Sequence, residues 1–237
     1  MRKHVLTLQG ETRKQAASLF TTKENSGAGI LMMHGYTGSR LDYADYAPEL
    51  TNYLGATCLS IDLAGHGKSG GDFQTLTPQQ YFYDTLEAYD FLSDLPDVDS
   101  ARIGVVGASF GGYFAALIAG ARSPKSVLLR APAIYEDHQY DQARESLDYQ
   151  DMQDFRHSLV HSLPECNLAL DAIAEYEGSV TIVESEHDDL IPPAVIQAYL
   201  SVAQNGLHRF IAGAQHGLEG VHRQTFREML VDWAREL

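Results

Sequence analysis

The sequence has little cysteine, few basic residues and no long apolar run, and each shortage excludes a class of protein. Cys58 and Cys166 are the only cysteines, too few for a disulfide framework or a cysteine-rich metal site. No apolar stretch approaches the roughly 20 residues that a membrane helix needs. Lys and Arg number 17 against 32 Asp and Glu, a formal net charge of −15. Because such a charge repels nucleic acid and anionic membrane surfaces, we expect neither as a partner.

The remaining composition is that of an ordinary globular protein. With 237 residues, of which 44% are hydrophobic, the chain can form one large α/β domain over residues 1–237. Residues 1–4 carry positive charge, but residues 5–9 are too short and too polar for the core of a secretion signal. We therefore expect a cytoplasmic protein. The composition does not choose between a monomer and a homodimer.

Short apolar runs alternate with longer amphipathic segments along the chain. The runs predict strands at 3–9, 15–21, 29–33, 56–61, 102–106, 126–130, 179–183 and 208–211. The amphipathic segments predict helices near 42–54, 78–95, 110–122, 165–177, 193–204 and 219–236. This order predicts an α/β fold with a mostly parallel eight-stranded sheet and helices on both faces. The first two strands are expected to form an antiparallel pair.

One segment interrupts this alternation. Residues 133–163 separate a predicted strand from the next predicted helix by more chain than a crossover needs. The segment is rich in carboxylates and contains Tyr135, Tyr140, Tyr149 and Phe155. An insertion after a strand's carboxyl end projects over the ligand crevice of an α/β sheet. We interpret it as a small helical cap, with an amphipathic helix on the flank of the domain as the alternative.

The most informative motif is Gly107-Ala108-Ser109-Phe110-Gly111, which follows one predicted strand and precedes a predicted helix. A serine at such a sharp strand-to-helix corner stands clear of the backbone, where it can act as a nucleophile. Glycine is needed two residues before and two residues after it, because a side chain there would collide with the neighbouring strand or helix. Ser109 is therefore the candidate nucleophile.

A serine hydroxyl is a weak nucleophile and needs a histidine base whose second ring nitrogen is held by a carboxylate. With such a corner in an α/β sheet, the acid and then the histidine follow the serine along the chain. Asp188 and Asp189 follow the strand predicted at 179–183, and either can be the acid. His216 follows the last predicted strand among small residues, and it is the candidate base.

The oxyanion of an acyl-transfer reaction needs two hydrogen-bond donors. The backbone N–H of Phe110 lies at the start of the helix after Ser109, where the helix dipole assists it. The loop at 33–39 follows another strand, and His34-Gly35 should turn it so that the N–H of Tyr36 faces the site. The candidate oxyanion hole therefore consists of these two amides.

Other polar residues compete for catalytic roles. Asp62 and His66 follow a predicted strand, but they precede the serine, and hydrogen bonds to the local backbone explain them. His157 and His161 have the i,i+4 spacing of a helical metal pair, yet no glutamate follows the first of them as in His-Glu-Xaa-Xaa-His. We interpret them as surface residues of the cap, and we expect no metal.

Five motifs in this order resemble the α/β-hydrolase superfamily, and the nearest branch resembles monoglyceride lipases, cinnamoyl and feruloyl esterases and serine aminopeptidases. They are His34-Gly35-Tyr36-Thr37-Gly38, Asp62-Xaa-Xaa-Gly65-His66-Gly67-Xaa-Ser69, Gly107-Xaa-Ser109-Xaa-Gly111-Gly112, Asp188-Xaa-Xaa-Ile191-Pro192 and Gln215-His216-Gly217. The resemblance covers nearly the whole chain. It implies an α/β-hydrolase fold, and its spacing between acid and proline favours Asp188 over Asp189.

The resemblance also implies an activity, that of a serine esterase which works through an acyl-enzyme. Ser109 would attack the carbonyl, His216 would transfer the proton and Asp188 would orient His216, with no organic cofactor. A short aromatic cap suggests a small or medium ester, of the cinnamoyl or feruloyl type among others, as the small-molecule partner. Aminopeptidase, thioesterase and acyltransferase reactions use the same residues, and a slow-turnover ligand-binding or signalling protein can retain them.

Overall fold

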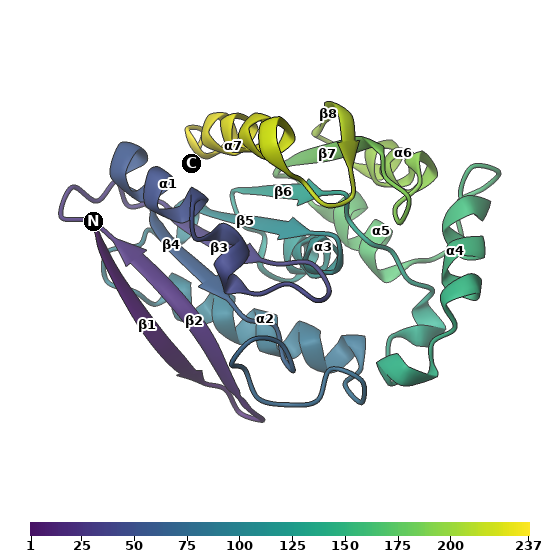
Figure 1. Ribbon diagram of the computed structural model, residues 1–237, viewed down its shortest axis with the longest axis horizontal. Coiled ribbons are helices and arrows are strands. Elements are labelled where there is room, and N and C mark those ends of the chain that lie inside the picture. Colours follow the sequence, from purple (N-terminus) through teal and green to yellow (C-terminus); the bar gives the residue numbers. More distant parts are fainter.

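A computed structural model describes residues 1–237 and contains one eight-stranded sheet flanked by helices (Figure 1). The strands are β1 (Arg2–Gln9), β2 (Lys14–Thr21), β3 (Gly29–Met33), β4 (Thr57–Ile61), β5 (Ile103–Ala108), β6 (Ser126–Arg130), β7 (Ser179–His187) and β8 (Gly206–Gln215). The α-helices are α1 (Tyr46–Leu54), α2 (Pro78–Ser93), α3 (Phe110–Arg122), α4 (Tyr149–Ser158), α5 (Leu168–Glu175), α6 (Pro193–Val202) and α7 (Gly220–Ala234).

The strands lie in the order β1-β2-β4-β3-β5-β6-β7-β8. The pairings β1–β2 and β2–β4 are antiparallel, and the pairings from β4 to β8 are parallel. This confirms the predicted α/β-hydrolase arrangement of a mostly parallel sheet with an antiparallel opening pair. Since parallel strands end at one edge, the loops that follow β3, β5, β6 and β7 converge there. Met33 pairs with Gly107, and Ala108 pairs with Arg130.

Two apolar cores lie on the two faces of the sheet because neighbouring strand residues point to opposite sides. On β3, Leu31 packs in the core beneath α2, α3, α5 and α6, whereas Met32 packs in the core beneath α1 and α7. Figure 1 shows α1 and α7 on one face of the sheet and α2 and α3 on the other. In the second core, the Trp233 indole N–H also donates to the Ser126 hydroxyl at 2.6 Å. Helices on both faces were predicted from the sequence.

Local signals set the helix ends. Thr77 caps α2 with its side chain, and Pro78 occupies the first turn of that helix. The side chain of Asn167 caps α5, which begins three residues later than the predicted helix at 165–177. The predicted helix at 42–54 is instead a 3₁₀ turn at Arg40–Tyr43 followed by α1.

The last two strands are longer than the sequence predicted. The strand expected at 179–183 continues to His187, and the strand expected at 208–211 continues to Gln215. The polar residues of these extensions misled the prediction, because side-chain bonds tie the two strands together. The Glu184 carboxylate lies 2.7 Å from His208 Nε2, and the Glu186 carboxylate accepts a hydrogen bond from the Gly213 N–H.

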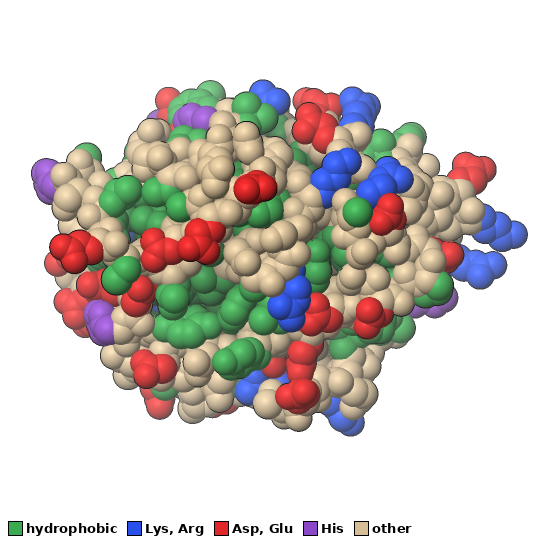
Figure 2. Space-filling model, turned by 180° about the vertical axis from the view of Figure 1, so that it is seen from behind, with side chains coloured by type: hydrophobic (Ala, Val, Ile, Leu, Met, Phe, Trp, Pro, Cys, Tyr) green, Lys and Arg blue, Asp and Glu red, His purple; other side chains and the backbone are tan.

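The predicted cap segment, residues 133–163, contains two 3₁₀ turns and α4, which Asp148 caps. Three backbone bonds tie the segment to the start of α2 and the loop before it: the Gln79 N–H donates to the Tyr140 carbonyl, the Arg144 N–H to that of Leu76 and the Glu145 N–H to that of Gln74. This end of the molecule, at the left of Figure 2, shows several acidic side chains. None of the helices in the fold has the length and apolar character needed to cross a membrane.

Candidate active site

Ser109 occupies the corner between β5 and α3 in a backbone conformation that is unusual for a residue with a side chain, with φ 51° and ψ −113°. The corner is tight: a Cβ on Gly107 would collide with the carbonyl of Gly111, and a Cβ on Gly111 would collide with that of Met33. The corner is also fixed by β6 and the residues after it, because the Ser109 N–H donates to Arg130 and the Ser109 carbonyl accepts from Ala133, both at 2.9 Å.

Asp188 and His216 meet at the carboxyl ends of β7 and β8. The His216 Nδ1 lies 2.9 Å from Oδ1 and 2.8 Å from Oδ2 of Asp188. Oδ1 also accepts hydrogen bonds from the N–H groups of Leu190 and Ile191 at 3.0 and 2.8 Å. Asp189 is exposed and forms no such contact. The structure thus pairs Asp188, the residue that the sequence favoured, with the histidine.

The hydrogen bonds to Asp188 determine its charge state. Burial by itself would raise the pKa of this carboxyl. The bond from His216, the attraction of that ring and the two amide bonds more than offset the burial, so the pKa of Asp188 lies below its ordinary value. An ionised carboxylate therefore faces Nδ1 of His216 at neutral pH, which favours a proton on that nitrogen and leaves Nε2 as the acceptor.

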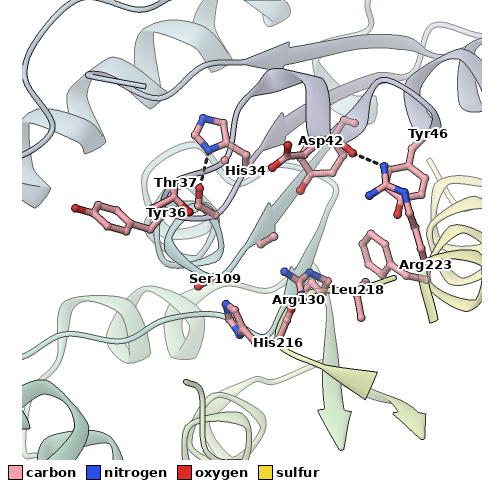
Figure 3. A pocket seen from close by; sticks show the side chains of 16 residues that line it. His34, Tyr36, Thr37, Asp42, Tyr46, Ser109, Arg130, His216, Leu218 and Arg223 are labelled. Carbon is pink, nitrogen blue, oxygen red and sulfur yellow. Dashed lines mark hydrogen bonds between the residues drawn. The ribbon is translucent and has the colours of Figure 1, made fainter. Parts of the chain in front are cut away.

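Ser109 and His216 line one cavity of about 440 Å³ (Figure 3). In Figure 3 the two side chains lie next to each other, one from the corner between β5 and α3 and one from the loop after β8. No direct hydrogen bond joins the Ser109 hydroxyl to the His216 ring, and such catalytic bonds commonly tighten only when substrate is bound. The three side chains predicted from the sequence converge here.

The loop after β3 passes directly over the serine. A Cβ at Gly35 would lie 3.4 Å from Cβ of Ser109. The Gly35 carbonyl lies 2.7 Å from His34 Nδ1 and accepts a 3.0 Å hydrogen bond from the Gly38 N–H. In a trans peptide the N–H points opposite to the carbonyl, so the Tyr36 amide is turned away from these partners. It donates to no backbone carbonyl, and the Phe110 amide is one of the free donors at the start of α3.

His34 is a buried and neutral residue. Its Nε2 accepts a hydrogen bond from the Leu63 N–H at 2.9 Å, so the proton resides on Nδ1. Burial is the main reason that the pKa of His34 falls to about 4. Because both ring nitrogens are engaged, His34 holds the loop that carries the Tyr36 amide and has no free position for proton transfer.

Asp62 and His66 have structural surroundings, as the sequence suggested. The fully buried Asp62 carboxylate accepts hydrogen bonds from the Arg40 N–H at 2.7 Å and the Lys68 N–H at 2.9 Å, and it pairs with the Arg40 guanidinium. His66 Nδ1 lies 2.8 Å from the Ala64 carbonyl, and its ring packs edge-on against Tyr36 with centroids 5.6 Å apart. Neither residue lines the cavity beside Ser109.

The walls of this cavity differ from the expectation that the aromatic cap would shape the pocket. They come from the loop after β3, the 3₁₀ turn that follows it, α1, the end of β6, the loop after β8 and α7. They include Thr37, Asp42, Tyr43, Tyr46, Arg130, Leu218, Arg223 and Phe226. The four aromatic residues named in the cap do not line the cavity. Tyr135 is instead buried in the core beneath α3, and Tyr140 and Phe155 pack against that core. These aromatic side chains therefore pack against the protein core rather than against a ligand.

The cap nevertheless contacts the residues beside Asp188. The side chains of Gln153 and Arg156, on α4, both donate to the Leu190 carbonyl at 3.2 Å. The N–H of the same Leu190 donates to Asp188. From the other end of the segment, the Arg144 guanidinium lies over the Tyr36 ring, 4.7 Å from its centroid. The predicted cap thus touches both the loop of the acid and the loop after β3.

The two exposed histidines of the segment, His157 and His161, do not come together with other ligands. His157 Nδ1 lies 2.8 Å from the Gln153 carbonyl of the same helix. The structure contains no group of three or more His, Cys, Asp or Glu residues that could hold a metal ion.

Comparison with known proteins agrees with the topology. A protein-family model described as "Alpha/beta hydrolase family" matches residues 30–228, which is most of the chain. The chain belongs to the alpha/beta hydrolase family. Two uncharacterized proteins of Mycobacterium tuberculosis, from strains CDC 1551 and H37Rv, are each 27% identical to this hydrolase-family chain over 182 residues. The match covers 77% of the chain and 60% of each relative, so the chain spans less than two thirds of these relatives.

Solved structures of other alpha/beta hydrolases share the fold. The esterase Est1E of Butyrivibrio proteoclasticus, solved with ferulic acid, superposes with a TM-score of 0.72 at 22% identity, covering 98% of this chain and 96% of that one. An esterase of Pyrococcus furiosus gives 0.74 at 21% identity, with 99% and 92% covered. The thioesterase domain of the curacin biosynthetic pathway gives 0.70 at 14% identity over the whole of both chains. At these identities the likeness extends to the fold.

Sequence reasoning missed the cavity residues contributed by β6, α1 and α7. Only Arg130 gave a local signal, since it places a charge at the end of the buried run Ser126–Leu129. Tyr46, Arg223 and Phe226 lie in ordinary amphipathic helices, where nothing distinguishes a cavity residue from a core residue.

Proposed function

We propose that this protein is a serine hydrolase that cleaves carboxylic esters through an acyl-enzyme. The observation that carries the proposal is the pairing of ionised Asp188 with His216 Nδ1, which turns Nε2 of the same ring toward the cavity that Ser109 lines. The strained corner at Ser109 supports it, because such a corner exposes a hydroxyl beside two free amides.

In the first half of the reaction, His216 Nε2 accepts the hydroxyl proton as the Ser109 oxygen attacks the ester carbonyl. Asp188 stabilises the imidazolium that forms. The carbonyl oxygen gains negative charge, and the amides of Tyr36 and Phe110 donate to it; loss of one such donor typically costs about 2.7–4 kcal/mol. The C–O bond of the alcohol then breaks, the alcohol leaves with the proton from His216, and the acyl group remains on Ser109.

In the second half, water replaces the alcohol. His216 accepts a proton from the water, which attacks the acyl carbonyl, and collapse of the second tetrahedral intermediate releases the carboxylic acid and restores the Ser109 hydroxyl. Every step uses side chains and amides of this chain together with water. A polar, water-accessible mouth is suited to this half-reaction, and Ser109 and His216 are both half-exposed there.

The test combines labelling with turnover. The wild-type protein, Ser109→Ala and His216→Ala are treated with a fluorophosphonate and assayed with p-nitrophenyl butyrate. We expect one label on Ser109, none on Ser109→Ala, and a fall in kcat of at least about 10⁴-fold in both variants. Ser201→Ala, which removes a hydroxyl bonded only to the Ala198 carbonyl on α6, is the matched control. Labelling at a residue other than Ser109 would refute the proposal, and labelling with only very slow turnover would favour a ligand-binding protein.

A further inference from the structure

Arg130 lines the cavity beside Ser109. Its positive charge has no carboxylate partner within ion-pair distance. The only hydrogen bond that its side chain forms within the protein runs from Nη1 to the His216 carbonyl at 2.8 Å. Arg13, Arg40, Arg122, Arg223, Arg227 and Arg235 each have a carboxylate within 4.0 Å. Of the two arginines that line the cavity, Arg130 is therefore the one without an ion pair.

The place of Arg130 in the fold gives this observation its meaning. The residue ends β6, directly beside Ala108 at the end of β5, so it adjoins the corner that carries Ser109. Figure 3 shows its guanidinium projecting into the cavity between His216 and Asp42. The planar fork has five N–H donors, and the single bond to His216 leaves the other four without an acceptor in the protein.

The surroundings do not neutralise this charge. Burial lowers the pKa of Arg130, and Asp188 and Asp42 act on it only from beyond ion-pair distance. Asp188 is engaged by His216, and Asp42 accepts a hydrogen bond from the Ser39 N–H in the cap of the 3₁₀ turn. A second cation, Arg223, lines the same cavity, although it is already bonded to the Asp42 carbonyl and to Asp45. A guanidinium withdrawn from water is costly unless an anion pairs with it.

From this geometry we infer that the ester substrate carries a carboxylate, which binds to Arg130 while Ser109 attacks the ester carbonyl. The inference rests on the proposed function and names its substrate class. A carboxylate fits because the flat guanidinium can donate two parallel N–H···O bonds to it. The aromatic rings of Tyr43, Tyr46 and Phe226 supply the apolar wall against which the rest of the substrate packs. The cavity of about 440 Å³ suits a small molecule.

The net charge of the protein bears on where a preference for an anionic ester could come from. A formal charge of −15 repels anions at long range, so a preference for an anionic ester has to come from a local contact. At about 0.15 M ionic strength the long-range repulsion is largely screened, whereas a direct contact with the half-buried Arg130 is screened less. Under these conditions a charged hydrogen-bonded pair corresponds to a preference of about 10- to 100-fold.

The experiment compares matched esters in two arms. In the first arm the carboxylate is on the acyl side, in mono-p-nitrophenyl glutarate against p-nitrophenyl butyrate. In the second it is on the alcohol side, in 3-butyryloxybenzoate against 3-butyryloxybenzamide. We expect the wild-type protein to favour the anionic ester in at least one arm. Arg130→Gln should reduce that anionic-to-neutral ratio of kcat/KM by about 10-fold or more, mainly through KM. Arg130→Lys should retain part of the ratio, and Arg122→Gln, a surface arginine, should leave it unchanged.

Two results would overturn the inference: no anionic preference in either arm, or an equal loss with anionic and neutral esters in Arg130→Gln. The second result would mean that Arg130 only supports the His216 loop. If Arg130→Gln does not fold, protection of the wild-type protein decides: glutarate should slow fluorophosphonate labelling and glutaramide should not. Absence of both hydrolysis and labelling in the wild-type protein would instead contradict the proposed function itself.

Discussion

The molecule contains two aspartate–histidine clusters at the same edge of the sheet, and only one of them faces the cavity. After β4, Asp62 is fully buried and bonded to Arg40 and Lys68, with His66 turned to the Ala64 carbonyl. After β7 and β8, Asp188 holds Nδ1 of His216. The two clusters use the same residue types, but the first ties loops together and the second leaves a ring nitrogen at the cavity.

The two clusters differ in whether a donor to the aspartate also reaches the cavity. The Asp62 oxygens accept from three donors of the neighbouring loops, and none of those donors lines the cavity. Asp188 also accepts from two amides, but its third donor is a ring whose other nitrogen reaches the cavity. We conclude that the second cluster is the one suited to proton transfer, and that the first is suited to stability.

The largest expected effect is on the second cluster. Asp188→Asn should lower kcat for p-nitrophenyl butyrate by about 10⁴-fold, because the amide favours the wrong tautomer of His216. The unfolding free energy should change far less. Asp189→Asn, the adjacent exposed carboxylate, is the control and should stay within about threefold of wild type. If the Asp189 variant lost activity instead, our assignment of the acid would be wrong.

The corresponding change in the first cluster should affect folding. Asp62→Asn leaves the buried Arg40 guanidinium without its counter-charge, which we expect to cost about 3–5 kcal/mol of unfolding free energy. Urea denaturation followed by circular dichroism measures it. Asp90→Asn, which breaks the exposed pair with Arg122, should cost less than about 1 kcal/mol. Equal effects of the two variants would remove the contrast between the clusters.

His34, which packs against His66, should give the first cluster a pH dependence. Its pKa in the folded protein is about 4, against an ordinary value of 6.5. Between these values the unfolded chain takes up a proton that the folded protein excludes, so stability falls as the pH decreases from about 6.5 to about 4. The loss from this group is about 3 kcal/mol.

Denaturation curves over this pH range test the His34 prediction. Asp188 contributes in the same direction only at lower pH, because its folded pKa lies below 3.8. His34→Gln should have a shallower slope of stability against pH than wild type, and His161→Gln, at an exposed position, should have an unchanged slope. Identical slopes in wild type and His34→Gln would contradict a neutral, buried His34.

The smallest effect is expected where the cap touches the second cluster. Gln153→Leu removes one of the two donors to the Leu190 carbonyl and leaves Arg156 as the other. We expect kcat/KM to fall by about two- to fivefold, the equivalent of one neutral hydrogen bond. Gln150→Leu, on the exposed side of α4, is the control. No change in Gln153→Leu would mean that the cap does not influence the position of Asp188.

The sequence predicted the sheet and the converging residues because their signals are local. Glycines beside Ser109 mark a sharp strand-to-helix corner, and short apolar runs mark buried parallel strands. The choice between Asp188 and Asp189 depended on a turn in which Asp188 accepts from Leu190 and Ile191, a detail that two adjacent aspartates do not reveal. The family resemblance, rather than the residues alone, favoured the residue that the structure pairs with His216.

The cavity could not be predicted because its walls are distant in sequence. Tyr46 on α1 and Phe226 on α7 lie 5.6 Å apart between ring centroids, although about 180 residues separate them in the chain. The aromatic residues of the cap looked like pocket residues, yet Tyr135 became buried in the core. Whether an aromatic side chain meets a ligand or another side chain is decided by tertiary packing, which periodicity does not report.

The backbone conformation at Ser109 has a consequence for how the protein can be stabilised. A φ of 51° costs a residue with a side chain on the order of 1–3 kcal/mol, a cost that glycine largely avoids. Ser109→Gly should therefore unfold at a higher denaturant concentration than Ser109→Ala, while neither variant can be acylated. A search for more thermostable variants would tend to select glycine at this position, and it would thereby remove the one hydroxyl on which turnover depends.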